Sequence, residues 1–189
     1  FDATVVNEGT PTVRSALPLL SVTSTSTPPT PTILLAGSIQ STSGTWSQTC
    51  GTGTNRMLIV TSSEWRGDAN SQISTITYAG AGNHLTKLGQ AYNTATGALA
   101  TMWYKAGPAS GINTITASFT GGDIAFGSSC WENISQIVPP SDFVALSGNS
   151  SSPSTYVNNT AIGDIVVDGI SVFCKQTLTA STPQLKLAD

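Results

Sequence analysis

Charged side chains are scarce in this sequence. Only 9% of its 189 residues are Asp, Glu, Lys or Arg, against roughly a quarter in an ordinary soluble domain. The seven basic residues are scattered, and with ten acidic residues they give a net charge of −3. A protein that binds nucleic acid or an anionic membrane surface usually has a basic patch, so the sequence argues against both kinds of partner.

Histidine and cysteine are also sparse. His84 is the single histidine, and Cys50, Cys130 and Cys174 show no CxxC spacing. Metal sites built from these residue types need paired ligands, so no metal ligand is predicted. The cysteines leave two alternatives open, which are one disulfide with one free thiol, or three buried thiols that act as small apolar side chains.

Signals of catalysis and of membrane insertion are missing as well. No apolar run approaches 18 residues, so no membrane-spanning helix is predicted. A Ser–His–Asp triad would have to use His84, yet no serine lies in a G-x-S-x-G motif, and His84 starts a predicted strand. Asp164 and Asp168 share one face of another strand, but each adjoins a glycine, which favours a turn role. We therefore predict no catalytic, cofactor-binding or metal-binding residue and no enzymatic activity.

Short strands separated by turn residues dominate what is present. β-branched and aromatic runs alternate with Gly, Asn and Ser clusters, as in antiparallel sandwiches and barrels. The runs are Met57–Ser63, Ser74–Tyr78, His84–Leu88, Leu99–Lys105, Ile112–Phe119 and Ile124–Trp131. The apolar run of Met57 to Val60 predicts a central strand covered on both faces. Two glycines between Tyr78 and His84 predict a hairpin with a five-residue loop.

These patterns predict an all-β fold, an antiparallel, jelly-roll-like β-sandwich that spans residues 45–189. Asp164–Cys174 adds one more strongly apolar strand, and no amphipathic helix is found. The predicted core consists of ten apolar side chains: Leu58, Val60, Ile76, Trp103, Ile115, Phe119, Phe126, Ile165, Val167 and Ile170.

Residues 1–44 are predicted to form an extended arm with a lead-in strand. Leu20–Thr32 is rich in Ser, Thr and Pro, which favours extended backbone over a packed core. Ile33–Ala36 is expected to be a short strand that returns to the body, followed by a loop over Gly37–Gly44. We expect the arm to dock on a neighbouring subunit through a few apolar residues, and the alternative is a strap along its own domain. These residues are Phe1, Val5, Leu17, Leu19 and Leu20.

The order of the strand phrases resembles a β-sandwich module of bacterial surface proteins and tailed-phage virion proteins. The phrases that carry the resemblance are TWSQTCGTGTNRMLIV (Thr45–Val60), ITYAGAGNHLTKLGQA (Ile76–Ala91), MWYKAGPASGINTITASFTG (Met102–Gly121) and GDIVVDGISV (Gly163–Val172). The module has no established enzymatic residues, so the resemblance implies a fold and an extracellular or virion setting. The module generally continues with one or two further strands after the last phrase, where this chain has only the weak run Leu185–Leu187. Either Leu178–Leu187 is a divergent last strand, or an exposed sheet edge pairs with another chain.

One polar loop holds the residues most suited to contact a ligand. Trp65, Arg66 and Asp68 follow the Met57–Ser63 strand, and Arg66 to Asp68 matches the Arg-Gly-Asp tripeptide of integrin ligands, a common turn composition. Glu64, Asp68 and Asn70 offer oxygen atoms to Ca²⁺, without the spacing of a calcium loop. A solvated loop tip is the simpler interpretation of these residues.

Aromatic residues offer a second route to ligand binding. Trp103 and Tyr104 are adjacent on a strand and must face opposite sides, so at least one is expected in the core. Trp65 lies in a polar loop and is the candidate for stacking on a sugar. Two functions follow as expectations: a non-catalytic structural subunit of a virion or extracellular assembly, such as a capsid decoration, tail or surface filament protein, or a carbohydrate-binding adhesion module. The expected partners are copies of this chain, neighbouring structural subunits or surface glycans, with no cofactor.

Overall fold

The computed structural model describes residues 34–65, 68–121, 123–136, 143–148 and 164–171. All of them belong to one compact unit, Pro31–Asp189. The regular structure in this part of the chain is eight strands: β1 Leu34–Ser41, β2 Thr45–Cys50, β3 Met57–Trp65, β4 Ile73–Tyr78, β5 Thr86–Tyr92, β6 Ala98–Ala106, β7 Gly111–Phe119 and β8 Ile124–Glu132. A membrane-spanning helix does not occur among the described residues.

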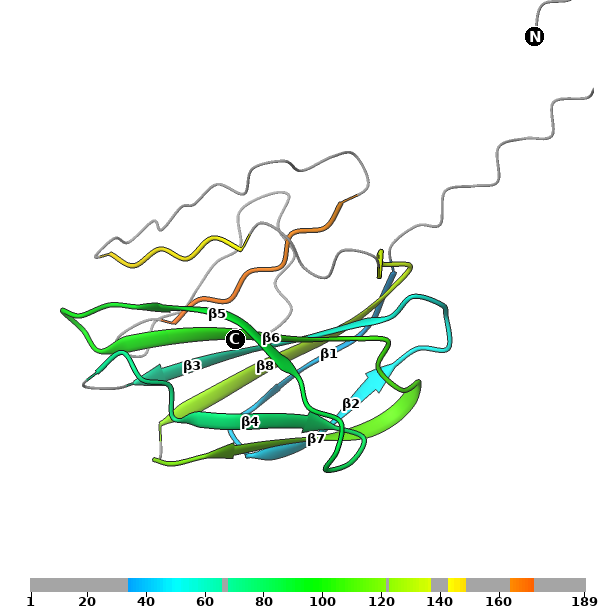
Figure 1. Ribbon diagram of the computed structural model, residues 1–189, viewed down its shortest axis with the longest axis horizontal. Helices are drawn as coiled ribbons and strands as arrows, with labels where there is room; N and C mark the ends of the chain where they lie inside the picture. The colour runs from blue at the N-terminus through cyan, green and yellow to red at the C-terminus, as the bar shows by residue number, and fades with distance from the viewer. Residues whose placement is uncertain (1–33, 66–67, 122, 137–142, 149–163, 172–189) are drawn as a thin grey trace, which may run out of the picture. The chain divides into compact units, whose positions relative to one another are not determined.

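The strands form two antiparallel sheets. The five-stranded sheet has the order β1-β8-β3-β6-β5, and the three-stranded sheet has the order β2-β7-β4 (Figure 1). Side chains of both sheets contribute to one hydrophobic core. The all-β, antiparallel class predicted from the sequence is confirmed, and the arrangement is consistent with a β-sandwich.

The six strand runs predicted from the sequence correspond to β3 to β8. The central position of β3 is also confirmed, because the strand pairs with β6 on one side and β8 on the other. Consecutive side chains from Met57 to Val60 are all buried, so both faces of β3 are covered. β2 was not predicted as a separate run, although its side chains alternate strictly between exposed and buried.

The loop predicted at Gly37–Gly44 is wrong from Gly37 to Ser41. β1 extends to Ser41 and pairs with β8 along its length, with a bulge between Leu35 and Gly37. The strand is hard to recognise because a glycine interrupts its apolar pattern, and a bulge breaks the period of two. β1, which the sequence analysis grouped with the arm, is therefore an edge strand of the five-stranded sheet.

The hairpin predicted around the Tyr78–His84 loop is reduced to a single bridge. Thr77 pairs with His84, and the Leu85 amide donates to the Ile76 carbonyl at 2.8 Å. Leu85 is then buried in the core, and the chain leaves the three-stranded sheet so that β5 pairs with β6. The turn chemistry was recognised correctly, but the next strand belongs to the opposite sheet.

Seven of the ten predicted core residues belong to the core or pack against it. Leu58, Val60, Ile76, Trp103, Ile115 and Phe126 are buried, and Phe119 is partly buried against them. The other three lie in segment 164–171, part of the predicted strand Asp164–Cys174, and this prediction is wrong for the described residues. Ile165 and Val167 are half-buried, Ile170 is 45% exposed, and no strand is formed there.

Segment 164–171 lies on the outer face of the five-stranded sheet. The Ser171 and Ser63 hydroxyls are 2.8 Å apart, and the Thr61 side chain occupies the space beside Gly169. Thr61 and Ser63 alternate along β3 with the core residues, so they face away from the three-stranded sheet. An apolar, extended sequence predicts packing, but it does not say on which layer the segment packs.

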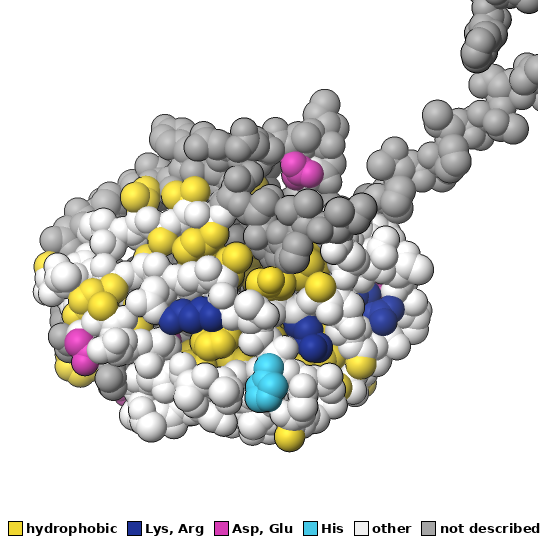
Figure 2. Space-filling model, in the orientation of Figure 1, with side chains coloured by type: hydrophobic (Ala, Val, Ile, Leu, Met, Phe, Trp, Pro, Cys, Tyr) yellow, Lys and Arg dark blue, Asp and Glu magenta, His cyan; other side chains and the backbone are white. Residues whose placement is uncertain are grey.

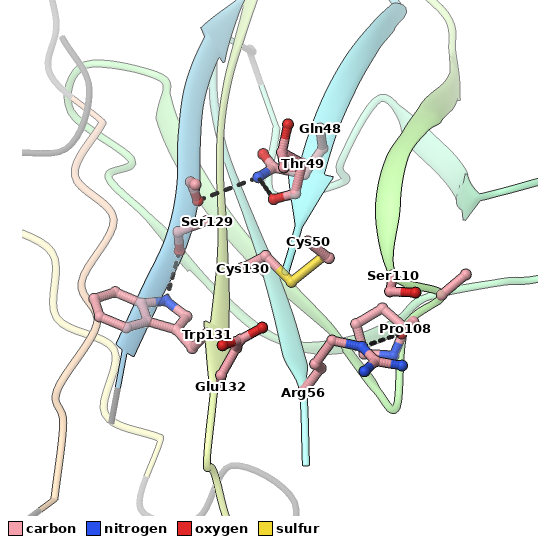
Figure 3. Close-up of a disulfide and its surroundings, with 12 residues drawn as sticks. Gln48, Thr49, Cys50, Arg56, Pro108, Ser110, Ser129, Cys130, Trp131 and Glu132 are labelled. Carbon is pink, nitrogen blue, oxygen red and sulfur yellow. Dashed lines mark hydrogen bonds between the residues drawn. A yellow bond between two sulfur atoms is a disulfide. The ribbon is translucent and has the colours of Figure 1, made fainter. Parts of the chain in front are cut away.

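A disulfide joins the two sheets. Cys50 of β2 is bonded to Cys130 of β8, with both residues fully buried and 80 positions apart in the sequence (Figure 3). The structure thus decides between the alternatives left open for these two cysteines, and Cys174 lies outside the described residues. Nearby, Trp46 of β2 stacks on Phe126 of β8 with ring centroids 4.9 Å apart. The covalent link and the stacked rings hold the same pair of strands together across the core.

Polar side chains beside the disulfide satisfy one another. The Trp46 indole donates to the Ser128 hydroxyl at 3.0 Å, and this hydroxyl donates to Gln48 Oε1 at 2.6 Å. Gln48 Nε2 donates in turn to the carbonyls of Gly37 and Thr49. Because each buried group has a partner, these polar residues fix the register of β2 against β1 and β8 at little cost in desolvation.

Candidate functional site

The loops at one end of the sheets contain the candidate ligand contacts. The β3–β4, β5–β6 and β7–β8 loops meet at the left of Figure 1. The Trp65 amide donates to the Asp123 carbonyl at 3.3 Å, and the Thr120 amide donates to the Gln72 carbonyl at 3.1 Å. These bonds tie the β3–β4 loop to the β7–β8 loop, so we call this part of the molecule the Trp65 end.

Trp65 is an exposed aromatic side chain with a fixed orientation. Its side chain is 56% exposed, and its indole Nε1 donates to the Thr96 carbonyl of the β5–β6 loop at 3.1 Å. The hydrogen bond holds one edge of the ring and leaves much of its surface open to solvent. An exposed indole with a hydrogen bond at one edge is suited to stacking on an apolar face of a ligand.

Asp68 and Arg66 are the two other predicted contact residues, and the structure describes only Asp68. Asp68 is exposed at the same end, and its Oδ1 accepts a hydrogen bond from the Asn70 amide at 2.8 Å, as in an Asx turn. Arg66 lies outside the described residues. The prediction that Trp65 lies in a loop is wrong, because Trp65 is the last residue of β3 and pairs with Ala98 of β6. Asp68 lies in the β3–β4 loop that follows. The Arg-Gly-Asp interpretation stays a prediction.

Glu64 is not in the loop where the sequence analysis placed it. It lies within β3 and is only 2% exposed, because even-numbered positions of this strand face the core. Its Oε1 accepts from the hydroxyls of Ser62 at 3.0 Å and Ser71 at 2.9 Å, and its Oε2 accepts from the Gln72 amide at 2.6 Å. The carboxylate oxygens are therefore occupied by hydrogen-bond donors of the protein itself.

A chain of buried polar groups extends from Glu64 into the core. The Ser62 and Thr101 hydroxyls are 2.6 Å apart, and the Trp103 indole donates to Thr101 Oγ1 at 2.9 Å. Ser62 and Thr101 are register partners on β3 and β6. The network anchors the start of the β3–β4 loop to the sheet below it, so its role at this end is to position the loop.

Gln72 contacts both Trp65 and the β7–β8 loop at the Trp65 end. Its Nε2 donates to the Trp65 carbonyl at 3.2 Å, and a Cβ at Gly121 would meet its Oε1 at 1.7 Å. Gly121 has φ of +110°, a conformation open mainly to glycine. The backbone conformation is therefore what favours glycine here, and a larger residue would also displace the end of the Gln72 side chain.

The opposite end of the sheets has a different chemistry. The Tyr78 hydroxyl donates to the Ala109 carbonyl at 2.9 Å and accepts from Asn113 Nδ2 at 3.1 Å. Burial raises the pKa of Tyr78 above its usual value of 10.0, although the Asn113 hydrogen bond and the Arg56 charge act in the other direction. The phenol stays protonated near neutral pH and holds the β6–β7 loop.

The residues weighed for catalysis are dispersed. His84 is exposed in the loop between β4 and β5, which turns at the end opposite Trp65. Asp164 and Asp168 are exposed on segment 164–171. Among the described residues, no group of three or more His, Cys, Asp or Glu side chains could hold a metal ion. As predicted, Trp103 is buried and Tyr104, on the opposite face, is half-buried.

Sequence reasoning missed two features of the site. The burial of Glu64 could have been found from the alternation of β3, because every second residue of a strand faces the same side. Glu64 is on the same side as the residues Leu58, Val60 and Ser62. The contact between Trp65 and Thr96 could not, because it joins the end of β3 to the β5–β6 loop, 31 positions later in the sequence, and the two meet only in the folded sheets.

Comparisons with family models, curated proteins and solved structures find no match to this chain. Its function is therefore inferred from its own strands, contacts and surfaces.

Proposed function

We propose that the chain is a non-catalytic structural subunit of an extracellular or virion assembly, such as a capsid decoration, tail or surface filament protein. In this proposal it functions at a virion or cell surface and assembles with copies of itself or with other structural subunits. Contacts are made through sheet edges and through the N-terminal arm. Nucleic acid and membrane insertion have no part in it.

The observation that carries this proposal is the order of the strands. β1 pairs with β8, β2 with β7 and β3 with β6, which is the pattern of one long hairpin rolled over itself. The pair that would complete this pattern is β4 with β5, and the single antiparallel bridge between Thr77 and His84 lies at that position. We infer a jelly-roll-like sandwich from this pattern, and jelly rolls are frequent in viral capsid proteins and lectins.

Two further observations support the setting. Disulfides form and persist in oxidising surroundings, and the Cys50–Cys130 link favours an extracellular location. The buried carboxylate of Glu64 is occupied by protein donors, and His84 lies at the other end of the sheets. This arrangement of the described residues suits a scaffold better than acid–base chemistry.

Deletion of Phe1–Thr32 tests the role proposed for the arm, whose residues Phe1, Val5, Leu17, Leu19 and Leu20 lie outside the described part of the chain. The truncated chain should stay folded, because both sheets begin after Thr32, and it should remain monomeric where the full chain assembles. Light scattering and electron microscopy of the two proteins measure this. Normal assembly after truncation would show that the arm is dispensable for assembly. An unfolded product would show that the arm is part of the core of its own domain.

A carbohydrate-binding adhesion module is the second candidate, and the exposed ring of Trp65 favours it. Trp65→Ala should then weaken binding on a glycan array at least about tenfold, because buried tryptophan anchors dominate many interfaces. Ile39→Ala, which removes an exposed apolar side chain from β1, is the matched control and should bind normally. Equal binding by the Trp65 variant and the wild-type chain would exclude Trp65 as the contact.

A further inference from the structure

The outward face of the three-stranded sheet consists almost entirely of hydroxyl side chains. Residues alternate between core and solvent along β2 and β7, and Thr75 and Thr77 of β4 continue the outward side. We call this surface the hydroxyl face. Its residues are Thr45, Ser47 and Thr49 on β2, Ile112, Thr114, Thr116 and Ser118 on β7, and Ser74, Thr75 and Thr77 on β4.

The hydroxyls form rows that cross the strands. Thr116 pairs with Thr45 on one side and with Thr77 on the other, which gives a row of three threonines. Ser47 faces Thr114, and Thr75 faces Ser118. The positions that carry neighbouring hydroxyls are therefore about 4.8 Å apart across the strands and about 6.7 Å apart along them.

Charge is absent from this sheet, whose strands TWSQTC, GINTITASF and ISTITY contain no Asp, Glu, Lys or Arg. The part of the surface over β4 and β7 that is visible in Figure 2 shows no acidic and no Lys or Arg side chain. An anionic ligand would find no cation here, on a protein of net charge −3. The complementary ligand is uncharged and rich in hydroxyl groups.

We propose that the hydroxyl face binds an extended, neutral polysaccharide chain that runs across β2, β7 and β4. The spacing between strands is close to the length of one pyranose unit in an extended glycan, so each strand of the Thr45–Thr116–Thr77 row meets about one sugar. Each threonine offers a hydroxyl that donates and accepts, beside a methyl group that contacts the carbon face of the ring.

Part of the surface is ordered before a ligand arrives. Thr77 Oγ1 donates to the Thr116 carbonyl at 3.4 Å, and Ser74 Oγ donates to the Ser118 carbonyl at 3.0 Å. Each of these hydroxyls keeps its acceptor positions for a ligand. Holding side chains in place before binding reduces the entropy lost on binding.

Two other occupants suit this face less well. A second copy would find little apolar area, since Ile112 is the one large apolar side chain of the face, whereas stable interfaces have an apolar core. A rigid crystalline lattice such as ice requires a flat array, whereas each strand of a sheet is rotated by roughly 20° relative to its neighbour. A glycan chain can follow that twist by rotation about its glycosidic bonds.

Affinity electrophoresis of the full chain tests the proposal, with gels that contain hydroxyethylcellulose, anionic alginate or no polymer. The wild-type protein should be retarded by the neutral glucan alone. The triple variant Thr45→Val, Thr77→Val and Thr116→Val keeps β-branched side chains and removes one hydroxyl row, and its dissociation constant should rise about tenfold. Thr86→Val, at an exposed position of β5 in the other sheet, is the matched control and should bind as the wild type does.

Several outcomes would overturn the proposal. They are absence of retardation, retardation by alginate alone, and equal retardation of the row variant and the wild type. If Trp65→Ala lost glucan binding and the row variant kept it, the glycan would instead bind at the Trp65 end. Dimerisation or inhibition of ice recrystallisation that depends on the row would assign the face to a second copy or to ordered water. Because assembly is measured separately by the arm deletion, this proposal and the structural one can fail independently.

Discussion

Replacing Cys50 and Cys130 together by alanine should lower the free energy of unfolding by about 4 kcal/mol. The link closes a loop of 80 positions, and the unfolded chain gains the corresponding entropy when the link is lost. The chain's total stability is expected to be of order 5–15 kcal/mol, so a large share depends on this one bond. Urea denaturation of the oxidised wild-type and the double variant measures the difference.

Cys174→Ala is the matched control for this experiment, since it removes a thiol and leaves the link intact. Its unfolding midpoint should stay close to that of the wild type. Thiol titration of the denatured, unreduced chain should find one free thiol, because two of the three cysteines are paired. Three free thiols, or an unchanged midpoint in the double variant, would contradict the pairing or its contribution to stability.

Glu64→Ala should lower the free energy of unfolding by about 3 kcal/mol. The substitution leaves the Ser62 hydroxyl, the Ser71 hydroxyl and the Gln72 amide without their shared acceptor in a buried position. Hydrogen exchange at the Gln72 amide should accelerate more than exchange in β8, because the loop start loses its anchor. Chemical denaturation and amide exchange by NMR measure the two effects.

Glu64→Gln separates the charge from the shape of the side chain. It keeps the volume and one acceptor oxygen, and the two serine hydroxyls can rotate to accept from its amide, so the loss should be about half as large. Asp68→Asn, at the exposed position of the same loop, should change stability by less than about 0.5 kcal/mol. If Glu64→Ala lowered the free energy of unfolding as little as Asp68→Asn does, the hydrogen-bond network of Glu64 would not be what holds the loop.

The candidate site was predictable to the extent that it depends on local pattern. Trp65 was predicted to be exposed because a tryptophan among Glu, Arg, Gly and Asp has few apolar neighbours in sequence. Glu64 was misplaced because the strand was ended two residues too early, at Ser63. A polar residue at a core-facing position is recognised only when the strand's end is known, and the bonds from Ser71 and Gln72 that make its burial tolerable arise in the fold.

The amino-acid sequence by itself determined the approximate positions of strands β3 to β8, the absence of helix among the described residues, and several of the apolar side chains that face the core from these strands. These properties depend on alternation and turn chemistry over a few residues. Tertiary structure alone decided that β5 joins β6 after one bridge to β4, and that Cys50 meets Cys130. It also decided that Thr45, Thr116 and Thr77 form one row. Each of these depends on which distant strands become neighbours, and strands of similar alternating pattern offer the same apolar face to several partners.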